Sequence, residues 1–157
     1  MSRDIILPLP GSVNMPKFSK ISQARLITCH QSLQDIFNEV VLYYDCAVLC
    51  GHRSKSEQDL AVKSGASKTP WPLSKHNSTP SIAVDVVPYP IVWPDFKKAP
   101  QKAIKDLARF YLFGGYVLGM ARSKGITLRW GGDWDKDWDI WENSFDDLPH
   151  FELVNKL

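Results

Sequence analysis

The chain has 157 residues, enough for one domain with a hydrophobic core and too few for two comfortable ones. Hydrophobic residues make up 44% and charged residues 23%, which is ordinary globular composition. The net charge is +2, but residues 1–132 hold 17 Lys and Arg against nine Asp and Glu, and residues 133–152 hold eight acidic residues and one lysine. A basic body favours a polyanionic surface and a dense acidic segment favours a cation, although solvated faces explain both equally well.

Three cysteines, Cys29, Cys46 and Cys50, are too few and too unevenly spaced for a disulfide framework, so we expect a reducing compartment of synthesis. Cys46 and Cys50 are expected to lie on one face of a strand as small core residues. The N-terminus lacks an apolar core long enough for a signal peptide, and the longest nearly apolar run, 110–121, is shorter than the roughly 20 residues of a membrane span. We therefore expect synthesis in the cytoplasm, no membrane span and a monomer.

The first half of the chain predicts a lead-in, two helices and a strand. Prolines make residues 1–20 irregular, and an apolar stripe with i, i+3, i+4 spacing then predicts a helix over 33–44 with Ser32 as N-cap. An apolar run predicts a buried strand over 46–50. Ser56 as N-cap and Gly65 as stop signal bound a short helix over 56–65. Residues 66–81 are rich in Ser, Thr, Pro and Lys and predict a loop.

The second half predicts three strands around a long helix. Strands are expected at 82–87, 126–130 and 150–154, the helix at about 100–123, and an acidic loop at 131–147. Helices and strands do not alternate regularly, which favours an α+β fold with a small, mainly antiparallel sheet. No repeat or internal linker is visible, so we expect one domain over 1–157.

Three residues from separate segments could converge on a metal. Asp85 is a lone carboxylate in an apolar strand, where burial without a partner costs several kcal/mol or more, so it needs a cation, a metal or strong donors. His76 precedes this strand and His150 begins another, and neighbouring strands would bring all three together. A mixed His/Asp/His set suits Zn²⁺ with one position open for water. Taken singly, each residue is more often a structural group, and the residues alone leave both interpretations open.

Two further residues complete the chemistry of such a site. Asp147 lies three residues before His150, with Pro149 stiffening the link, and could act as a general base that later protonates a leaving amine. Asp146 would point away from it. Arg53 could bind a substrate carboxylate or a developing oxyanion through its fork of donors. The alternative for Asp147 is ordinary turn chemistry before a proline.

The acidic loop alternates Asp133, Asp135, Asp137 and Asp139 with other residues. Carboxylates at such spacing are typical of calcium loops, although the central glycine and terminal glutamate of an EF-hand are absent. A solvated acidic loop and a weak Ca²⁺ site that orders it both fit the pattern. The tryptophans Trp130, Trp134, Trp138 and Trp141 could line a glycan or peptide cleft, or simply pack.

Four segments occur in order along the chain: GHRS (51–54), SKHNSTPSIAVD (74–85), RWGGDWD (129–135) and DLPHFEL (147–153). This order resembles that of the zinc D-Ala-D-Ala carboxypeptidase and L-alanyl-D-glutamate endopeptidase family, which includes many bacteriophage endolysins. The resemblance implies a DD-peptidase/hedgehog-like α+β fold whose antiparallel sheet carries the zinc. It also implies ligands His76, Asp85 and His150, a general base Asp147, a substrate-binding or oxyanion-stabilising Arg53, and a contact to the second shell or substrate from Ser74. Trp130 is a further candidate for such a contact.

The chain departs from the family pattern between His76 and Asp85. Eight residues separate them where the family usually has six, and the usual glycine is absent. Two extra residues keep strand parity, because side-chain direction repeats every two residues, so the loop with His76 takes a different path. His52 is the alternative ligand.

The resemblance implies a peptidase that cuts cell-wall peptides. The alternatives are a D-Ala-D-Ala carboxypeptidase or dipeptidase, and a non-catalytic zinc-stabilised binding module. Nucleic-acid binding by the basic body of residues 1–132 has no interleaved aromatic or helical motif to support it, and it is not the expected function.

Overall fold

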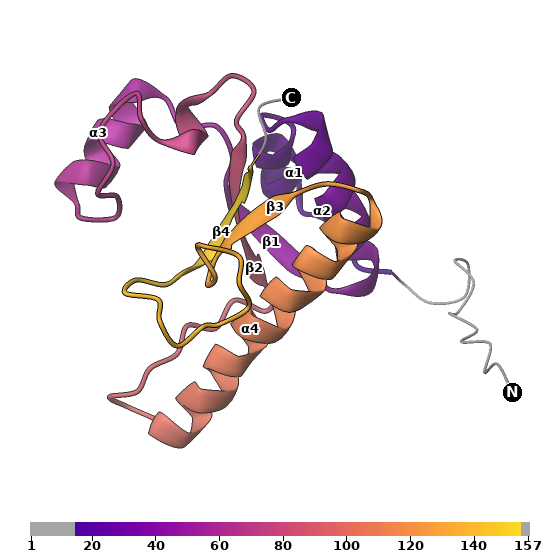
Figure 1. Ribbon diagram of the computed structural model, residues 1–157, viewed down its shortest axis with the longest axis vertical. Coiled ribbons are helices and arrows are strands. Elements are labelled where there is room, and N and C mark those ends of the chain that lie inside the picture. Colours follow the sequence, from indigo (N-terminus) through magenta and orange to yellow (C-terminus); the bar gives the residue numbers. More distant parts are fainter. Residues whose placement is uncertain (1–14, 155–157) are drawn as a thin grey trace, which may run out of the picture.

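The computed structural model describes residues 15–154, in which a long helix lies across one face of a small sheet (Figure 1). The strands are β1 (Cys46–Cys50), β2 (Ala83–Pro88), β3 (Leu128–Gly131) and β4 (Asp147–Leu153). They form a sheet in the order β1-β2-β4-β3, in which each neighbouring pair is antiparallel. The predicted α+β fold with a small antiparallel sheet is confirmed, and β2 and β4 are its two central strands.

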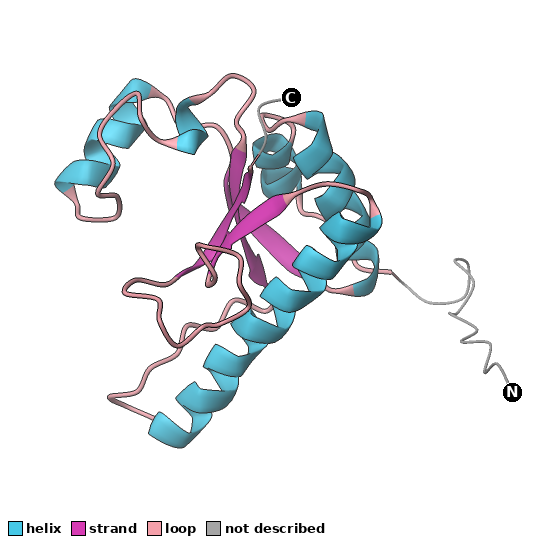
Figure 2. Cartoon of the chain, viewed as in Figure 1, coloured by secondary structure: helices cyan, strands magenta, loops and turns pink. Residues whose placement is uncertain are grey.

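The helices are α1 (Lys20–Leu26), α2 (Gln31–Tyr43), α3 (Lys55–Lys63) and α4 (Pro100–Ser123), and a 3₁₀ turn, η1, spans Lys75–Asn77. Figure 2 shows α3 and η1 set apart from the other helices, beside one end of the sheet. The core lies between the sheet and the helices α2 and α4 and contains Phe37, Val84, Phe113 and Phe151. The opposite face of the central strands is therefore free to carry polar side chains.

Two N-caps differ from those predicted, and one helix was not expected. α2 begins after His30, whose Nδ1 accepts from the amide of Ser32, so Ser32 lies inside the helix. α3 begins after Ser54 rather than Ser56, because Ser54 and Glu57 form a reciprocal capping box. α1 is short and carries one apolar turn, which gives too little periodicity to detect. Of the predicted lead-in over 1–20, residues 1–14 lie outside the described part of the chain.

A β-bulge corrects the prediction for Cys50. The ladder pairs Val48 with Val86 and then Cys50 with Asp85, so Leu49 is an extra residue on β1. The extra residue reverses the side-chain alternation, because the period of a strand is two. Cys46 is buried in the core as expected, whereas Cys50 lies on the face that carries Asp85.

β4 begins three residues before the predicted start, at Asp147. The ladder with β3 pairs Trp130 with Phe151 and then Gly131 with Asp147, so Pro149 falls in an irregular stretch where no partner needs its missing amide. A Cβ at Gly131 would clash with the carbonyl oxygen of Asp147, so only glycine allows this close approach. The irregularity brings Asp147 to the edge of the polar face.

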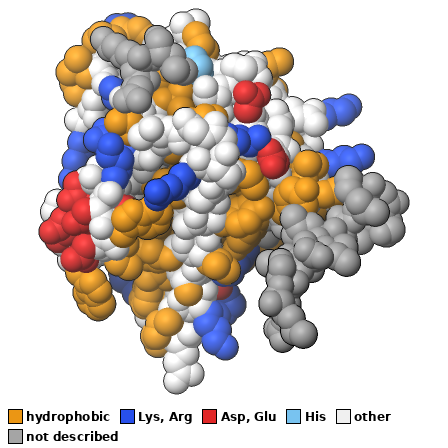
Figure 3. Space-filling model, turned by 45° about the vertical axis from the view of Figure 1, so that its right-hand side comes forward, with side chains coloured by type: hydrophobic (Ala, Val, Ile, Leu, Met, Phe, Trp, Pro, Cys, Tyr) orange, Lys and Arg blue, Asp and Glu red, His pale blue; other side chains and the backbone are white. Residues whose placement is uncertain are grey.

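The surface keeps many exposed apolar side chains, which Figure 3 shows in orange over much of one face. Ile104 and Leu112 on α4 are 62% and 67% exposed. Over residues 15–154, no helix is both long enough and apolar enough to span a membrane.

Candidate active site

Three side chains converge on the polar face of the central strands. Asp85 lies in β2 and His150 in β4, and the ladder pairs these two residues directly. His76 comes from η1, which begins after Ser74, whose hydroxyl accepts from the amide of His76 at 3.3 Å. The longer segment after His76 does not keep this residue from the strands, because the amide of Arg53 also donates to the carbonyl of His76 at 2.9 Å.

The converging atoms form a nearly equilateral triangle. His76 Nε2 lies 3.2 Å from Asp85 Oδ1 and 3.3 Å from His150 Nδ1, and His150 Nδ1 lies 3.2 Å from Asp85 Oδ1. Zinc bonds of about 2.0–2.1 Å in a tetrahedron place ligand atoms roughly 3.3 Å apart. The triangle therefore fits one face of a tetrahedral zinc site, with the fourth position directed away from it.

Each histidine is fixed by a contact of its other ring nitrogen. Nδ1 of His76 donates to the carbonyl oxygen of Gly51 at 2.7 Å, and Nε2 of His150 lies 2.9 Å from a carboxylate oxygen of Glu152. Glu152 is buried and also accepts from Nε of Arg129 at 2.9 Å. These partners leave the unprotonated nitrogen of each neutral ring facing the triangle, which is how outer-shell groups orient metal-binding histidines.

Hydrogen bonds within the triangle shift the pKa values of its residues. Burial by itself lowers the pKa of His76, but hydrogen bonds to Asp85 and Cys50 outweigh it and raise the pKa to about 10. Burial opposes the ionisation of Asp85, but its hydrogen bonds to His150 and His76 hold its pKa well below the usual range. A metal that binds at the triangle would therefore displace a proton from His76.

Cys50 offers a second donor set with two of the same residues. Ligand atoms of Cys50, His76 and Asp85 lie within 4.8 Å of one another. The thiol of Cys50 also lies 3.6 Å from Nη2 of Arg53, which donates to it. The direct ladder pairing of His150 with Asp85 and the contact of its Nε2 with Glu152 favour His150 over Cys50 as the third ligand.

Asp147 and Arg53 line the same cleft as the residues of the triangle. Asp147 is half-buried, and burial together with the negative charge of Asp85 raises its pKa, which suits a general base. Nη2 of Arg53 lies 3.5 Å from Asp85 Oδ2, and Nη1 donates to Gln58 Oε1 at 3.1 Å. Asp146 accepts from the hydroxyl of Tyr111, away from the cluster, as expected.

A cleft of about 600 Å³ opens over the cluster and includes Arg53, Ser74 and Asp147 in its lining. Trp134 forms part of its wall, with its ring centroid 5.6 Å from that of His150. Phe145 stacks on Trp134, and the ammonium of Lys68 lies 5.2 Å from the centroid of the Phe145 ring. The cleft thus has a charged floor and an aromatic rim.

Trp130 was a candidate for contact with the substrate or the second shell, or for simple packing, and in the structure it packs. It is 4% exposed, packs on Phe151 and donates from Nε1 to the carbonyl of Leu148 at 2.7 Å. It lines a smaller cavity of about 250 Å³ beside α4 rather than the cleft. The side chain of Trp130 points to the core face of β3, where its partner Phe151 also lies. The tryptophan of the motif RWGGDWD that lines the cleft is therefore Trp134.

The acidic loop brings some of its carboxylates together. Ligand oxygens of Asp133, Asp135 and Asp137 lie within 4.8 Å of one another, and Asp139 is not part of that group. Both oxygens of the buried Asp133 already accept backbone amides, from Lys136 and Trp138. The predicted Ca²⁺ site over these four residues stays a prediction.

Sequence reasoning missed Gln58, Glu152 and the carbonyl of Gly51. Glu152 follows His150 by two residues in a strand, so alternation alone could have placed it on the same face. Gln58 and Gly51 carried no comparable signal. His52, the alternative ligand, is half-buried, does not line the cleft, and donates its amide to Thr28.

The fold and the cleft agree with a family match over the whole described part of the chain. The model of the phage L-alanyl-D-glutamate peptidase family matches residues 15–154, and the chain belongs to this family. The peptidase family identifies the protein as an enzyme that hydrolyses peptidoglycan peptides.

Among solved structures, the chain is similar to the L-Ala D-Glu endopeptidase ChiX of Serratia marcescens, with 26% sequence identity and a TM-score of 0.64. That match covers 91% of this chain and 93% of ChiX. The comparison with curated proteins gives no match.

Proposed function

We propose that the protein is a zinc-dependent endopeptidase that hydrolyses the bond between L-alanine and D-glutamate in peptidoglycan stem peptides. The observation that carries the proposal is the triangle of His76, Asp85 and His150, whose 3.2–3.3 Å edges fit a tetrahedral zinc site. The family of the chain and the activity named for ChiX support the choice of bond.

The residues around the triangle divide the work of hydrolysis. Zinc held there would polarise the scissile carbonyl and lower the pKa of a water molecule to about 7. Asp147, with its raised pKa, takes a proton from the attacking water and passes it to the leaving amine. Arg53 lines the cleft, with Nη2 3.5 Å from Asp85, and its guanidinium stabilises a substrate carboxylate or the developing oxyanion.

Digestion of purified peptidoglycan, followed by mass spectrometry of the released ends, tests this function. New N-terminal D-glutamate and C-terminal L-alanine are expected from the wild type. Release of terminal D-alanine would instead establish the alternative carboxypeptidase activity.

The Asp147→Asn variant is the control for catalysis, because it removes the base and leaves the triangle intact. If the wild type and this variant both bind zinc and both leave the wall undigested, the domain is a non-catalytic binding module. Metal analysis alone does not separate these outcomes, because both kinds of protein bind zinc.

The proposal extends to the setting in which the enzyme works. We infer that it is made in the bacterial cytoplasm and acts as a monomer on the cell wall. Sedimentation of the purified protein tests the oligomeric state.

A further inference from the structure

Gln58 is an unusual anchor for a helix. It is 0% exposed and is the buried residue of α3, whose apolar Leu60 and Val62 face solvent. Short helices normally attach through apolar residues, because burying an amide costs free energy unless its hydrogen bonds are made. A glutamine in this place therefore indicates a need for its hydrogen bonds.

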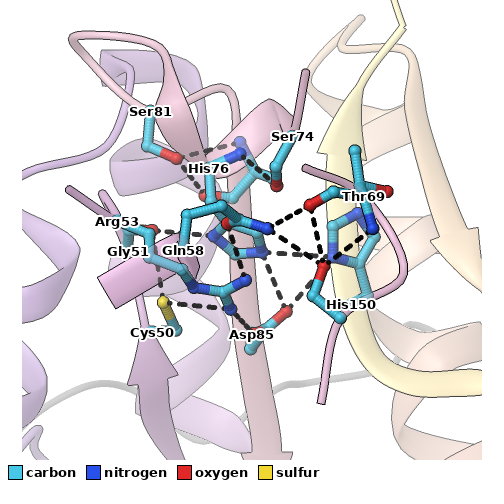
Figure 4. A network of polar contacts seen from close by, with 12 residues as sticks. Cys50, Gly51, Arg53, Gln58, Thr69, Ser74, His76, Ser81, Asp85 and His150 are labelled. Carbon is cyan, nitrogen blue, oxygen red and sulfur yellow. Dashed lines mark hydrogen bonds and ion pairs between the residues drawn. The ribbon is translucent and has the colours of Figure 1, made fainter. Parts of the chain in front are cut away.

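The amide of Gln58 is fully used. Oε1 accepts from Arg53 Nη1 at 3.1 Å and from Asn77 Nδ2 at 3.3 Å. Nε2 donates to the hydroxyl of Ser67 at 3.0 Å and to the carbonyl of Thr69 at 2.6 Å. Figure 4 shows this side chain between Arg53 and Thr69, next to His76 and Asp85. One amide thus joins α3, the arginine and the loop after α3.

Each partner of Gln58 belongs to the cleft or touches it. Arg53, Ser67 and Thr69 line the cleft. Asn77 follows His76 in η1, and its Nδ2 also donates to the carbonyl of Arg53 at 3.0 Å. With Nη1 held by Gln58, Nη2 is left to face Asp85 at 3.5 Å and Cys50 at 3.6 Å. The hydrogen bond from Nη1 to Gln58 therefore fixes the rotation of the guanidinium.

We propose that Gln58 is a positioning residue. It holds the guanidinium of Arg53 and the cleft-lining loop 67–69, here called the 67–69 rim, in place beside the triangle. For the part played by Arg53 the proposal rests on the proposed function. Gln58 does not touch the space over the triangle, so its effect on turnover passes through Arg53 and the rim.

Two substitutions separate the two effects of Gln58, one through Arg53 and the other through the 67–69 rim. Gln58→Met keeps the length of the side chain and removes all four hydrogen bonds, so we expect kcat/KM to fall roughly tenfold to a hundredfold, the loss typical of a misplaced catalytic group. Gln58→Glu still accepts from Arg53 and Asn77 but cannot donate to Thr69. We expect it to raise KM through the rim while kcat stays near the wild-type value.

The matched control is Ser22→Ala, because Ser22 is also buried and its hydroxyl accepts the amide of Val48 at 3.1 Å, away from the cleft. It should lower the melting temperature without changing kcat/KM per folded molecule. If Gln58→Met loses activity only in proportion to its unfolded fraction, as Ser22→Ala would, the role of Gln58 is structural and the proposal is overturned.

A double-mutant cycle tests the connection to Arg53. In an Arg53→Ala background, Gln58→Met should add little to the loss of kcat, because its effect on kcat passes through Arg53, whereas independent, multiplicative losses of kcat would overturn the proposal.

Hydrogen exchange of the 64–73 segment gives a readout that does not depend on the bond cleaved. Amide hydrogens of this segment should exchange faster in both Gln58 variants than in the wild type and in Ser22→Ala. Unchanged exchange would overturn the claim that Gln58 holds the 67–69 rim. Faster exchange in a protein that leaves peptidoglycan intact would instead reject the proposed function and leave the packing role of Gln58 in place.

Discussion

Replacing Glu152 with glutamine should weaken metal binding without removing a ligand. Glu152 is 4% exposed, and although burial opposes its ionisation, its contacts with His150 and Arg129 hold its pKa below the usual range. One carboxylate oxygen lies 2.9 Å from His150 Nε2 and the other accepts from Arg129 Nε at 2.9 Å. A glutamine amide has one oxygen to accept from these two donors. Its NH₂ group would therefore face the N–H of either His150 or Arg129, and that hydrogen bond would be lost.

The size of the effect follows from the two contacts. Loss of the carboxylate behind a metal-binding histidine typically costs about 10- to 100-fold in metal affinity, or roughly 1.4–2.7 kcal/mol. The metal-free protein should also lose stability. Because the side chain of Arg129 is 36% exposed and water can replace part of the lost contact, we expect about 1–2 kcal/mol rather than the larger cost of a fully buried pair.

Zinc competition against a chromophoric chelator measures the change in affinity. The matched control is Asp106→Asn, the same chemical change at another buried carboxylate, which accepts from Lys102 Nζ at 2.6 Å on α4. This control should leave the zinc affinity unchanged. A folded Glu152→Gln protein with wild-type zinc affinity would refute the assignment of His150 as a ligand oriented by Glu152.

Three further changes test other parts of the molecule. His150→Ala should lose zinc, whereas Asp147→Asn should keep it and lose roughly 10²–10⁴ in kcat; near-normal digestion of walls by the latter would contradict its role as base. Because zinc needs a neutral imidazole and the pKa of His76 is about 10 without metal, zinc affinity should rise with pH up to about 10, and calorimetry at pH 7 in two buffers should detect a released proton. The fully buried Phe151 contacts Phe37 and Phe113, so Phe151→Ala should lower the free energy of unfolding by about 3–5 kcal/mol in denaturant titrations; a loss below about 1 kcal/mol would contradict its place in the core.

The convergence of His76, Asp85 and His150 could be predicted because one residue broke a strong pattern. Asp85 interrupts an apolar strand, and the cost of burying a lone carboxylate demanded a partner. The sheet then places His150 directly beside it and η1 brings His76 within 3.2 Å. The long helix over 100–123 was also predictable, because its apolar spacing persists over many turns.

Other features depend on contacts that local sequence does not record. Whether Cys50 faces the core or the cleft is decided by a one-residue bulge. The early start of β4 depends on how closely Gly131 approaches Asp147. Gln58 reads as an ordinary surface residue of a polar helix until the loop at 67–69 folds over it. In each case the conformation depends on a contact with a residue distant in the sequence, or on one extra residue in a strand.

The direct pairing of Asp85 with His150 has a consequence for folding fidelity. A slip of one residue between β2 and β4 would turn one of these side chains to the opposite face, because strand alternation has a period of two. A metal ion bound by both residues would stabilise only the correct alignment. Zinc binding would then select the native pairing of the two central strands. A chain with misaligned strands would lack the free energy of metal binding that stabilises the native register.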